Sequence, residues 1–258
     1  MFNGVHILDE VIKESLDEEI NPETLHADTQ GQSTAIFGLS HLLGIKLMPR
    51  IRNWKDLKFV KSDESITYEH IDELFSDKVN WKLIETHLPD MLRVALSIKM
   101  GKIIPSTVLR KLGTYSKKNK LYQAFRELGL VIRTIFLLSY ISDIDLRRTI
   151  QEAQNKNEAF NDFVKWLSFG NEDITENDRN EQHKIVKYNH LIANCVIFYN
   201  VFHMSIILQK LKSEGYEITD EIIERLSPYI RYHINRFGKY RINKNRKVPN
   251  LIFDIKIA

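Results

Sequence analysis

The first fifty residues alternate between helical and extended patterns of hydrophobic positions. Apolar residues spaced three and four apart predict an amphipathic helix over Val5–Glu18. A short strand is predicted over Thr24–Thr29, and a second helix over Ser33–Leu43 is expected to end at Gly44. Another strand is predicted over Ile45–Ile51. This strand–helix–strand order indicates an α/β protein in which helices cover a mixed sheet.

Beyond Trp54 the strand pattern almost disappears and helical spacing takes over. The most apolar stretch, Leu191–Leu208, contains two asparagines and a histidine, so we predict a buried helix there and not a membrane span. The helices expected after Trp54 cover Tyr68–Phe75, Trp81–Lys99, Pro105–Leu112, Lys118–Ser139, Ile144–Glu152, Asn157–Leu167, Asn180–Ser213 and Asp220–Leu226, the last with Asp220 as its N-cap.

These patterns divide the chain into four parts. Residues 1–60 contain both predicted strands, and residues 61–150 are expected to form an all-helical insertion. Residues 151–240 form a second, mostly helical part. Residues 241–258 form a basic C-terminal segment with a β-prone end.

The composition is that of a folded domain in a reducing compartment. Hydrophobic residues make up 43% of the 258 positions, enough for a substantial core. The single cysteine, Cys195, excludes an internal disulfide and fits a cytoplasmic location. We expect Cys195 to pack as a small hydrophobic residue, and Trp54, Trp81 and Trp166 to lie in the core.

Positive charge is concentrated, although the net charge is only +3. Residues 99–133 carry nine bases and one acid, and residues 231–247 carry seven bases and no acid. By contrast, residues 1–30 carry eight acids and one base. Clustered bases suit a polyphosphate backbone, although a solvated surface has the same composition.

Two carboxylates from distant segments are candidate metal ligands. Asp28 ends the first predicted strand, which would present it rigidly, and Glu158 lies early in a predicted helix. Carboxylate oxygens are the ligands that Mg²⁺ prefers, and paired metal ions about 3.5–4 Å apart catalyse phosphoryl transfer. Since the chain has 34 acidic residues, the spacing of one pair is weak evidence.

Several blocks around these acids, in order along the chain, resemble the C-terminal catalytic region of the Tn-three family of replicative DNA transposases. Asp28 matches the second of the two aspartates in the family's catalytic triad, and Glu158 matches its glutamate. The similar blocks are His26–Gly31, Phe37–Arg52, Ser97–Gly101, Leu121–Gly129, Arg133–Leu138, Asn155–Ala159 and Leu226–Tyr240.

The resemblance implies an incomplete ribonuclease-H-like fold with a large helical insertion. It implies a DDE transposase that needs Mg²⁺, with Mn²⁺ as a substitute, to cleave transposon ends and join them to target DNA. It also implies a homodimer in the intact family. The family's first aspartate would lie upstream of Met1, so we expect a fragment truncated at its N-terminus and inactive alone.

Six basic residues are candidate DNA contacts. Arg50 and Arg52 follow the second predicted strand, where they could clamp phosphate. The other four are Arg179, Arg236, Lys239 and Arg241. His26 lies two residues before Asp28 on the same strand face and could tune the site. A structural or solvated role is the alternative for each.

Three functions therefore stay open from the sequence. The chain is the catalytic part of a transposase, a non-catalytic remnant that binds DNA and interferes with an intact transposase, or a helical protein-interaction module. The two basic segments argue against the third.

Overall fold

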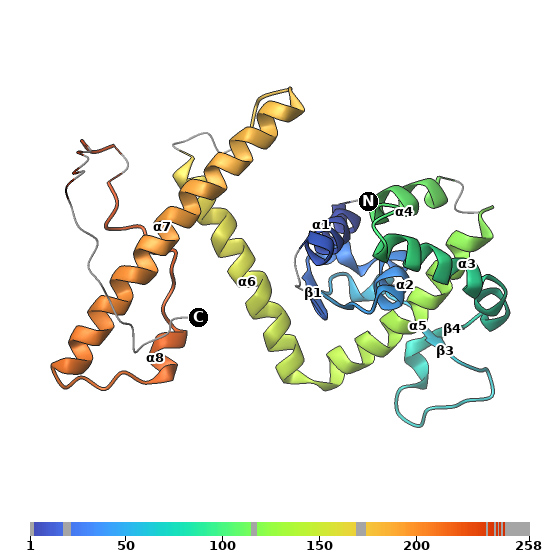
Figure 1. Ribbon diagram of the computed structural model, residues 1–258. Helices are drawn as coiled ribbons and strands as arrows, with labels where there is room; N and C mark the ends of the chain where they lie inside the picture. The colour runs from blue at the N-terminus through green and yellow to red at the C-terminus, as the bar shows by residue number, and fades with distance from the viewer. Residues whose placement is uncertain are drawn as a thin grey trace. The chain divides into compact units, whose positions relative to one another are not determined.

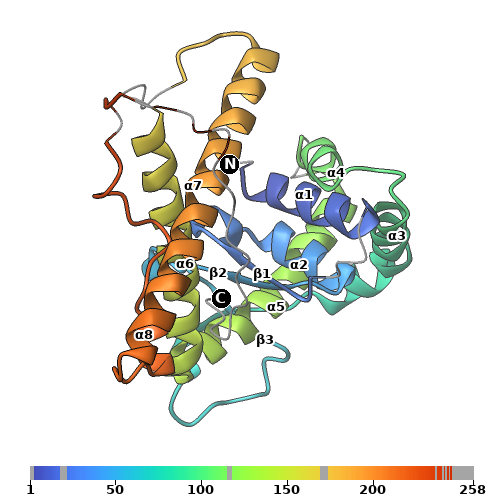
Figure 2. The ribbon, with the colours of Figure 1, turned by 60° about the vertical axis from the view of Figure 1, so that its left-hand side comes forward.

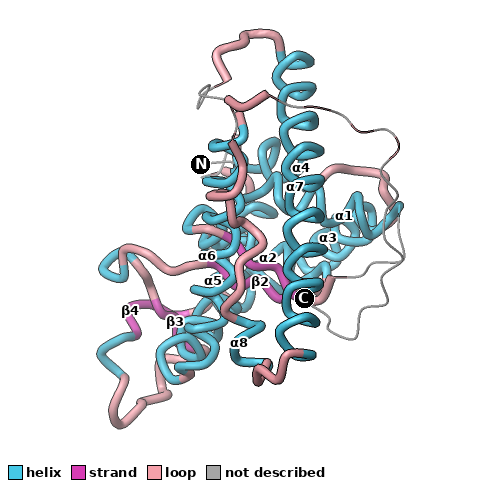
Figure 3. The backbone as a smooth tube through the Cα atoms, turned by 90° about the vertical axis from the view of Figure 1, so that its left-hand side faces the viewer, coloured by secondary structure: helices cyan, strands magenta, loops and turns pink. Residues whose placement is uncertain are grey.

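The computed structural model describes residues 3–17, 22–114, 118–168, 174–235, 237–239, 241, 243 and 245. The chain forms two compact units, Met1–Asn155 and Lys156–Ala258. Helices dominate the described residues, and the strands are short (Figure 3).

The first unit is a mixed α/β arrangement, which confirms the predicted class. Its element order can be followed in Figure 1. The elements are α1 (Asn3–Asp17), β1 (Thr24–Ala27), the 3-10 helix η1 (Thr29–Gln32), α2 (Thr34–Leu43), β2 (Lys46–Pro49), η2 (Trp54–Asp56), β3 (Phe59–Lys61), η3 (Asp72–Leu74), β4 (Phe75–Lys78), α3 (Trp81–Lys99), α4 (Pro105–Gly113), α5 (Lys120–Ser142) and the first part of α6 (Ile144–Leu167).

The strand–helix–strand prediction is confirmed. Strands β1 and β2 pair in parallel, with Thr24 opposite Lys46 and Ala27 opposite Pro49 (Figure 2). Helix α2 connects them and ends at Gly44, whose φ of 80° is left-handed and whose N–H donates to the carbonyls of His41 and Ser40. Glycine adopts this conformation without a steric penalty, so the chain can turn directly into β2.

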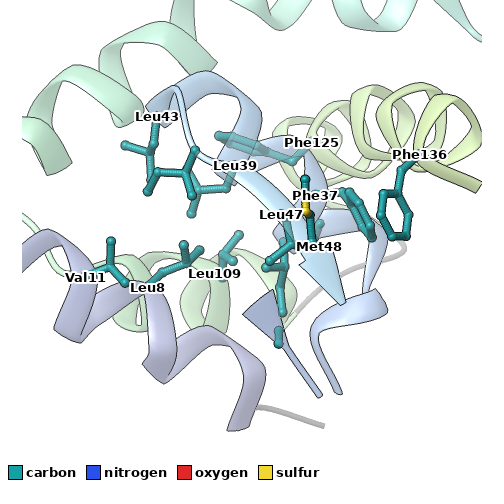
Figure 4. Packing of buried hydrophobic residues seen from close by; sticks show 14 of the residues in the cluster. Leu8, Val11, Phe37, Leu39, Leu43, Leu47, Met48, Leu109, Phe125 and Phe136 are labelled. Carbon is teal, nitrogen blue, oxygen red and sulfur yellow. The ribbon is translucent and has the colours of Figure 1, made fainter. Parts of the chain in front are cut away.

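The core of the first unit lies between α1, α2, α5 and the β1–β2 sheet. Phe37 and Leu39 on α2 are buried together with Phe125 on α5 and Leu8 on α1 (Figure 4). Full burial of each such side chain contributes roughly 1.5–3 kcal/mol. Helices α2 and α5 are in close contact at Gly38 and Gly129, where an added Cβ would collide with backbone atoms of the other helix.

The predicted helix over Tyr68–Phe75 is wrong. That segment contains a turn, η3 and the start of β4, which pairs in parallel with β3. The Tyr68 ring stacks on Phe75 at 4.8 Å, and Lys61 forms an ion pair with Asp72 at 2.6 Å. Contacts to β3 therefore override a local helical spacing.

The second unit contains the end of α6, α7 (Arg179–Ser213) and α8 (Asp220–Glu224). The two helices predicted over Ile144–Glu152 and Asn157–Leu167 are one continuous helix, because no glycine or proline interrupts the sequence between them. Phe163 and Ala193 are buried between α6 and α7. The N-cap of α8 is Thr219, whose side chain accepts the Ile222 N–H, and not the predicted Asp220.

Several expected core positions are exposed. By length and composition alone α7 could cross a membrane, yet only 22% of its most apolar 18-residue window is buried among the described residues, so the expected burial of Leu191–Leu208 is wrong. Cys195 on this helix is also exposed. Trp54 and Trp81 are each 42% exposed, whereas Trp166 packs partly buried against Phe163.

Candidate carboxylate site and nucleic-acid interface

Asp28 lies at the carboxyl end of a parallel pair of strands. It follows β1 directly, and its carbonyl accepts the Gly31 N–H at 3.0 Å, which opens η1. Directly after the neighbouring strand β2, the Arg50 N–H donates to the Ala27 carbonyl at 2.9 Å. Asp28 and Arg50 are therefore neighbours at the edge of the sheet where open α/β proteins bind ligands.

The turn after Asp28 is tightly packed. A Cβ atom on Gly31 would lie 2.6 Å from the Cβ of Ala27, closer than real side chains approach. Gly31 therefore lets η1 fold back onto the end of β1. This packing fixes the backbone that presents the exposed Asp28 side chain.

Arg133 is a component of this edge that the sequence analysis did not single out. Its Nη1 donates to the Gln32 carbonyl in η1 at 3.2 Å. Its buried Nε, and the buried Oε1 of Gln32, have no hydrogen-bond partner among the described residues. Burial, and to a smaller extent repulsion from Arg126, lowers the pKa of Arg133. Arginine nevertheless stays charged in proteins, so a half-buried cation stands behind the Asp28 turn.

We predict that Arg133→Met changes the free energy of unfolding by no more than about 1 kcal/mol. The loss of one hydrogen bond to Gln32 costs roughly 1 kcal/mol, and removal of a desolvated cation offsets it. Urea unfolding of the variant measures the difference, with Arg126→Met as the exposed control on the same helix. A loss of several kcal/mol would indicate that Arg133 has an anionic partner in the folded protein.

Glu158 lies in the second unit, on α6, and its side chain is exposed. The helix begins at Ile144, so Glu158 lies just past its middle and not early in it as predicted. One turn further along, Asp162 forms an ion pair with Arg231 at 3.0 Å, and Arg231 lies 5.8 Å from the centre of the Trp166 ring. Residues four apart share a helix face, so Glu158 lies beside an anchored acid–base pair.

The candidate DNA-binding residues are distributed over both units. Arg52 is exposed in the first unit. Arg179 is exposed at the start of α7, where Asp178 caps the helix by accepting the N–H groups of Asn180 and Glu181. Lys239 and Arg241 are exposed, and Arg236 lies outside the described residues. Exposure is compatible with DNA contacts and does not by itself assign them.

Two other polar residues of the first unit have identifiable surroundings. Loss of water around the imidazole lowers the pKa of His26, which keeps the ring neutral at pH 7. Asp9 accepts the Ser106 N–H at 2.8 Å and so satisfies a donor in the first turn of α4. Asp9 therefore has a structural role, consistent with its position on α1 away from the strand ends.

Among the described residues no group of three or more His, Cys, Asp or Glu side chains is positioned to hold a metal ion. Asp28 offers the hard oxygen ligands that Mg²⁺ requires, but it is only one ligand. Within the described parts of the chain, the carboxylates thus have the right ligand chemistry for a metal ion. Too few of the described carboxylates lie together to form a complete metal site.

The first unit is thus a helix-rich α/β structure that presents a carboxylate at the end of a parallel strand. Residues 2–240 match the family model described as the Tn3 transposase DDE domain, and the chain belongs to this family.

Similar full-length proteins are transposases that are much longer than this chain. The chain is 35% identical to the transposase for transposon Tn1546 of Enterococcus faecium, over 99% of this chain and 26% of that protein. It is 34% identical to the transposase for transposon gamma-delta of Escherichia coli (strain K12), over 86% of this chain and 22% of that protein. It is 30% identical to the transposase for transposon Tn21 of Escherichia coli, over 95% of this chain and 25% of that protein. The chain therefore spans about a quarter of the length of these relatives.

Proposed function

We propose that this chain is part of the catalytic domain of a Tn3-family transposase and supplies Asp28 and Glu158 to DNA cleavage and strand transfer at transposon ends. The observation that carries the proposal is the coincidence of two independent features. The family match extends over residues 2–240, and the aspartate of the matched block lies at the carboxyl end of a parallel strand.

The proposed fold is ribonuclease-H-like with a helical insertion. The parallel pair β1–β2, connected by α2, supports the strand part of this proposal. Helices α3, α4 and α5 follow β4 without a further strand among the described residues, which supports the inserted helical part.

Mg²⁺, or Mn²⁺ in its place, is the proposed cofactor. When bound, such ions activate the attacking oxygen and stabilise the leaving oxygen in phosphoryl transfer. The chain's own contribution is a fixed carboxylate, because Gly31 and the η1 turn restrict the Asp28 backbone. Arg50, adjacent on the sheet edge, would orient a phosphate of the DNA strand. The proposed partners are DNA, as transposon ends and target, and a second copy of the transposase.

The test is strand cleavage by the full-length transposase that carries this segment, on a plasmid bearing its transposon ends. We expect nicks at the ends in Mg²⁺ or Mn²⁺ and none in EDTA. The 258-residue chain matches two of the three acids that the family resemblance implies, so we expect no efficient nicking by it alone. Efficient Mg²⁺-dependent nicking by the pure chain, abolished by Asp28→Ala, would contradict that expectation.

A DNA-binding role without catalysis is the second candidate, and the concentrated positive charge favours it. A chain that contacts several phosphates should bind duplex DNA with a log–log salt slope near −0.9 per contact. DNA binding with that salt slope, together with no cleavage by the full-length protein, would support the hypothesis that the chain is a non-catalytic remnant. Such a remnant would bind DNA and interfere with an intact transposase.

A further inference from the structure

The segment after β2 combines positive charge with an exposed aromatic ring. Residues 50–58 contain the bases Arg50, Arg52, Lys55 and Lys58 and only one acid, Asp56. Trp54 lies among them and is 42% exposed. A single exposed apolar residue is ordinary at a protein surface, so the contacts and charges around Trp54 must decide its role.

The Trp54 ring is held in place by packing against another aromatic ring. It packs at 47° against Tyr140 of α5, with 5.7 Å between ring centres. Tyr140 in turn packs against Phe136, and Phe136 against Phe37 in the core. A row of four aromatic rings therefore leads from the core to the surface, and Trp54 is its outer member.

The backbone around Trp54 is also fixed. Asn53 adopts a left-handed conformation with φ 57° and ψ 57°, which asparagine tolerates better than most residues other than glycine. The Asp56 N–H then donates to the Asn53 carbonyl at 2.9 Å, and the Leu57 N–H donates to the Trp54 carbonyl at 3.2 Å. These two hydrogen bonds fix the backbone that carries the Trp54 side chain.

Trp81 provides an internal comparison, because it has the same exposed fraction of 42%. The Trp81 Nε1 donates to the Ser62 carbonyl at 2.9 Å, so its indole ties α3 to the loop after β3. The indole N–H of Trp54 has no such partner among the described residues. The hydrogen bond to Ser62 therefore gives Trp81 a structural role that explains its position. Among the described residues, no comparable hydrogen bond of its indole N–H explains the position of Trp54.

Trp54 is close to the proposed reaction site along the chain. It lies four residues after Arg50, whose backbone is hydrogen-bonded to the end of β1 next to Asp28. Four residues span at most about 14 Å when fully extended. One DNA strand could therefore place a phosphate near Asp28 and stack a base a short distance along the strand on Trp54.

We propose that Trp54, supported by Tyr140, is a stacking platform for an unpaired base of the DNA strand at the cleavage site. This inference rests on the proposed function and adds a binding residue to it. The basic side chains of residues 50–58 would attract the DNA phosphates. The face of the indole ring would stack on one nucleobase regardless of the DNA sequence. Stacking on an aromatic side chain is sequence-tolerant because every base has a π face.

The test compares Trp54→Ala with Trp81→Ala in the full 258-residue chain, using single-stranded and fully duplex oligonucleotides of the same sequence. We expect Trp54→Ala to weaken single-strand binding by about tenfold, within the range for loss of one stacked base, and to change duplex binding by less than about threefold. Trp81→Ala should leave both affinities unchanged, and Trp54→Phe should retain most single-strand binding. Stacking should also quench a 2-aminopurine base in the single strand, and this quenching should disappear in Trp54→Ala.

Equal affinities of wild type and Trp54→Ala for the single strand would overturn the platform, as would failure of the wild-type chain to bind single strands. Thermal unfolding of each variant separates these results from misfolding. The platform and the proposed catalytic function fail in different assays. A full-length protein that cleaves normally with Trp54→Ala overturns the platform alone, and a protein that stacks 2-aminopurine on Trp54 without cleaving overturns catalysis alone.

Discussion

In a transposase that contains this segment and cleaves transposon ends as proposed, Asp28→Asn and Glu158→Gln should each reduce the metal-dependent cleavage by about 10²–10⁴-fold. A catalytic metal contributes several kcal/mol of transition-state stabilisation, and each 1.4 kcal/mol corresponds to a factor of ten. Both substitutions keep the size of the side chain and remove only the charge and one oxygen ligand. The expected loss therefore reports on metal binding and not on packing.

Exposed acids provide matched controls for both positions. Asp56 in η2 is an exposed acid six residues after Arg50, and Glu152 is an exposed acid on α6, the helix that carries Glu158. Asp56→Asn and Glu152→Gln should leave cleavage within about twofold of wild type, as expected for surface substitutions. DNA affinity should survive in all four variants, since the phosphate contacts remain. Normal cleavage by Asp28→Asn would remove Asp28 from the proposed site.

The sheet edge that carries Asp28 and Arg50 was largely predictable because its signals are local. The strand–helix–strand order follows from periodicity and from Gly44, and parallel pairing then places Asp28 next to Arg50. The family-like block around Asp28 strengthened that prediction, and the family itself is confirmed by the match over residues 2–240.

Other features depend on contacts that the sequence does not display. Residues 68–75 have helical spacing, but the pairing of β4 with β3 decides their structure. Arg133 belongs to a run of nine bases in residues 99–133, and nothing in that run distinguishes the one that packs behind η1. Trp54 is apolar by type, and only the structure reveals that its ring is the exposed end of an aromatic row.

Gly129→Ala should destabilise the first unit by about 3 kcal/mol or more, the upper range for overpacking in a core. A Cβ at this position would lie 1.6 Å from the Thr34 carbonyl oxygen, and one at Gly38 would lie 2.3 Å from the Phe125 carbonyl oxygen. Both obstacles are backbone atoms, so α2 and α5 would have to separate. Alanine's better helix propensity returns at most about 1 kcal/mol, which the clash exceeds.

The same substitution should also disturb the sheet edge that carries Asp28. Thr34 begins α2 directly after η1, and Arg133 lies one turn beyond Gly129 on α5. Separation of the helices would therefore lengthen the Arg133–Gln32 hydrogen bond and release the turn that presents Asp28. Thermal unfolding should show a fall in melting temperature of about 6–12 °C. Gly113→Ala is the control, because its Cβ would meet Tyr122 at an ordinary 3.5 Å, and we expect it to be neutral or slightly stabilising. Equal melting temperatures for Gly129→Ala and Gly113→Ala would mean that α2 and α5 are not in such close contact. The proposed dependence of the η1 turn on this helix contact would then be wrong as well.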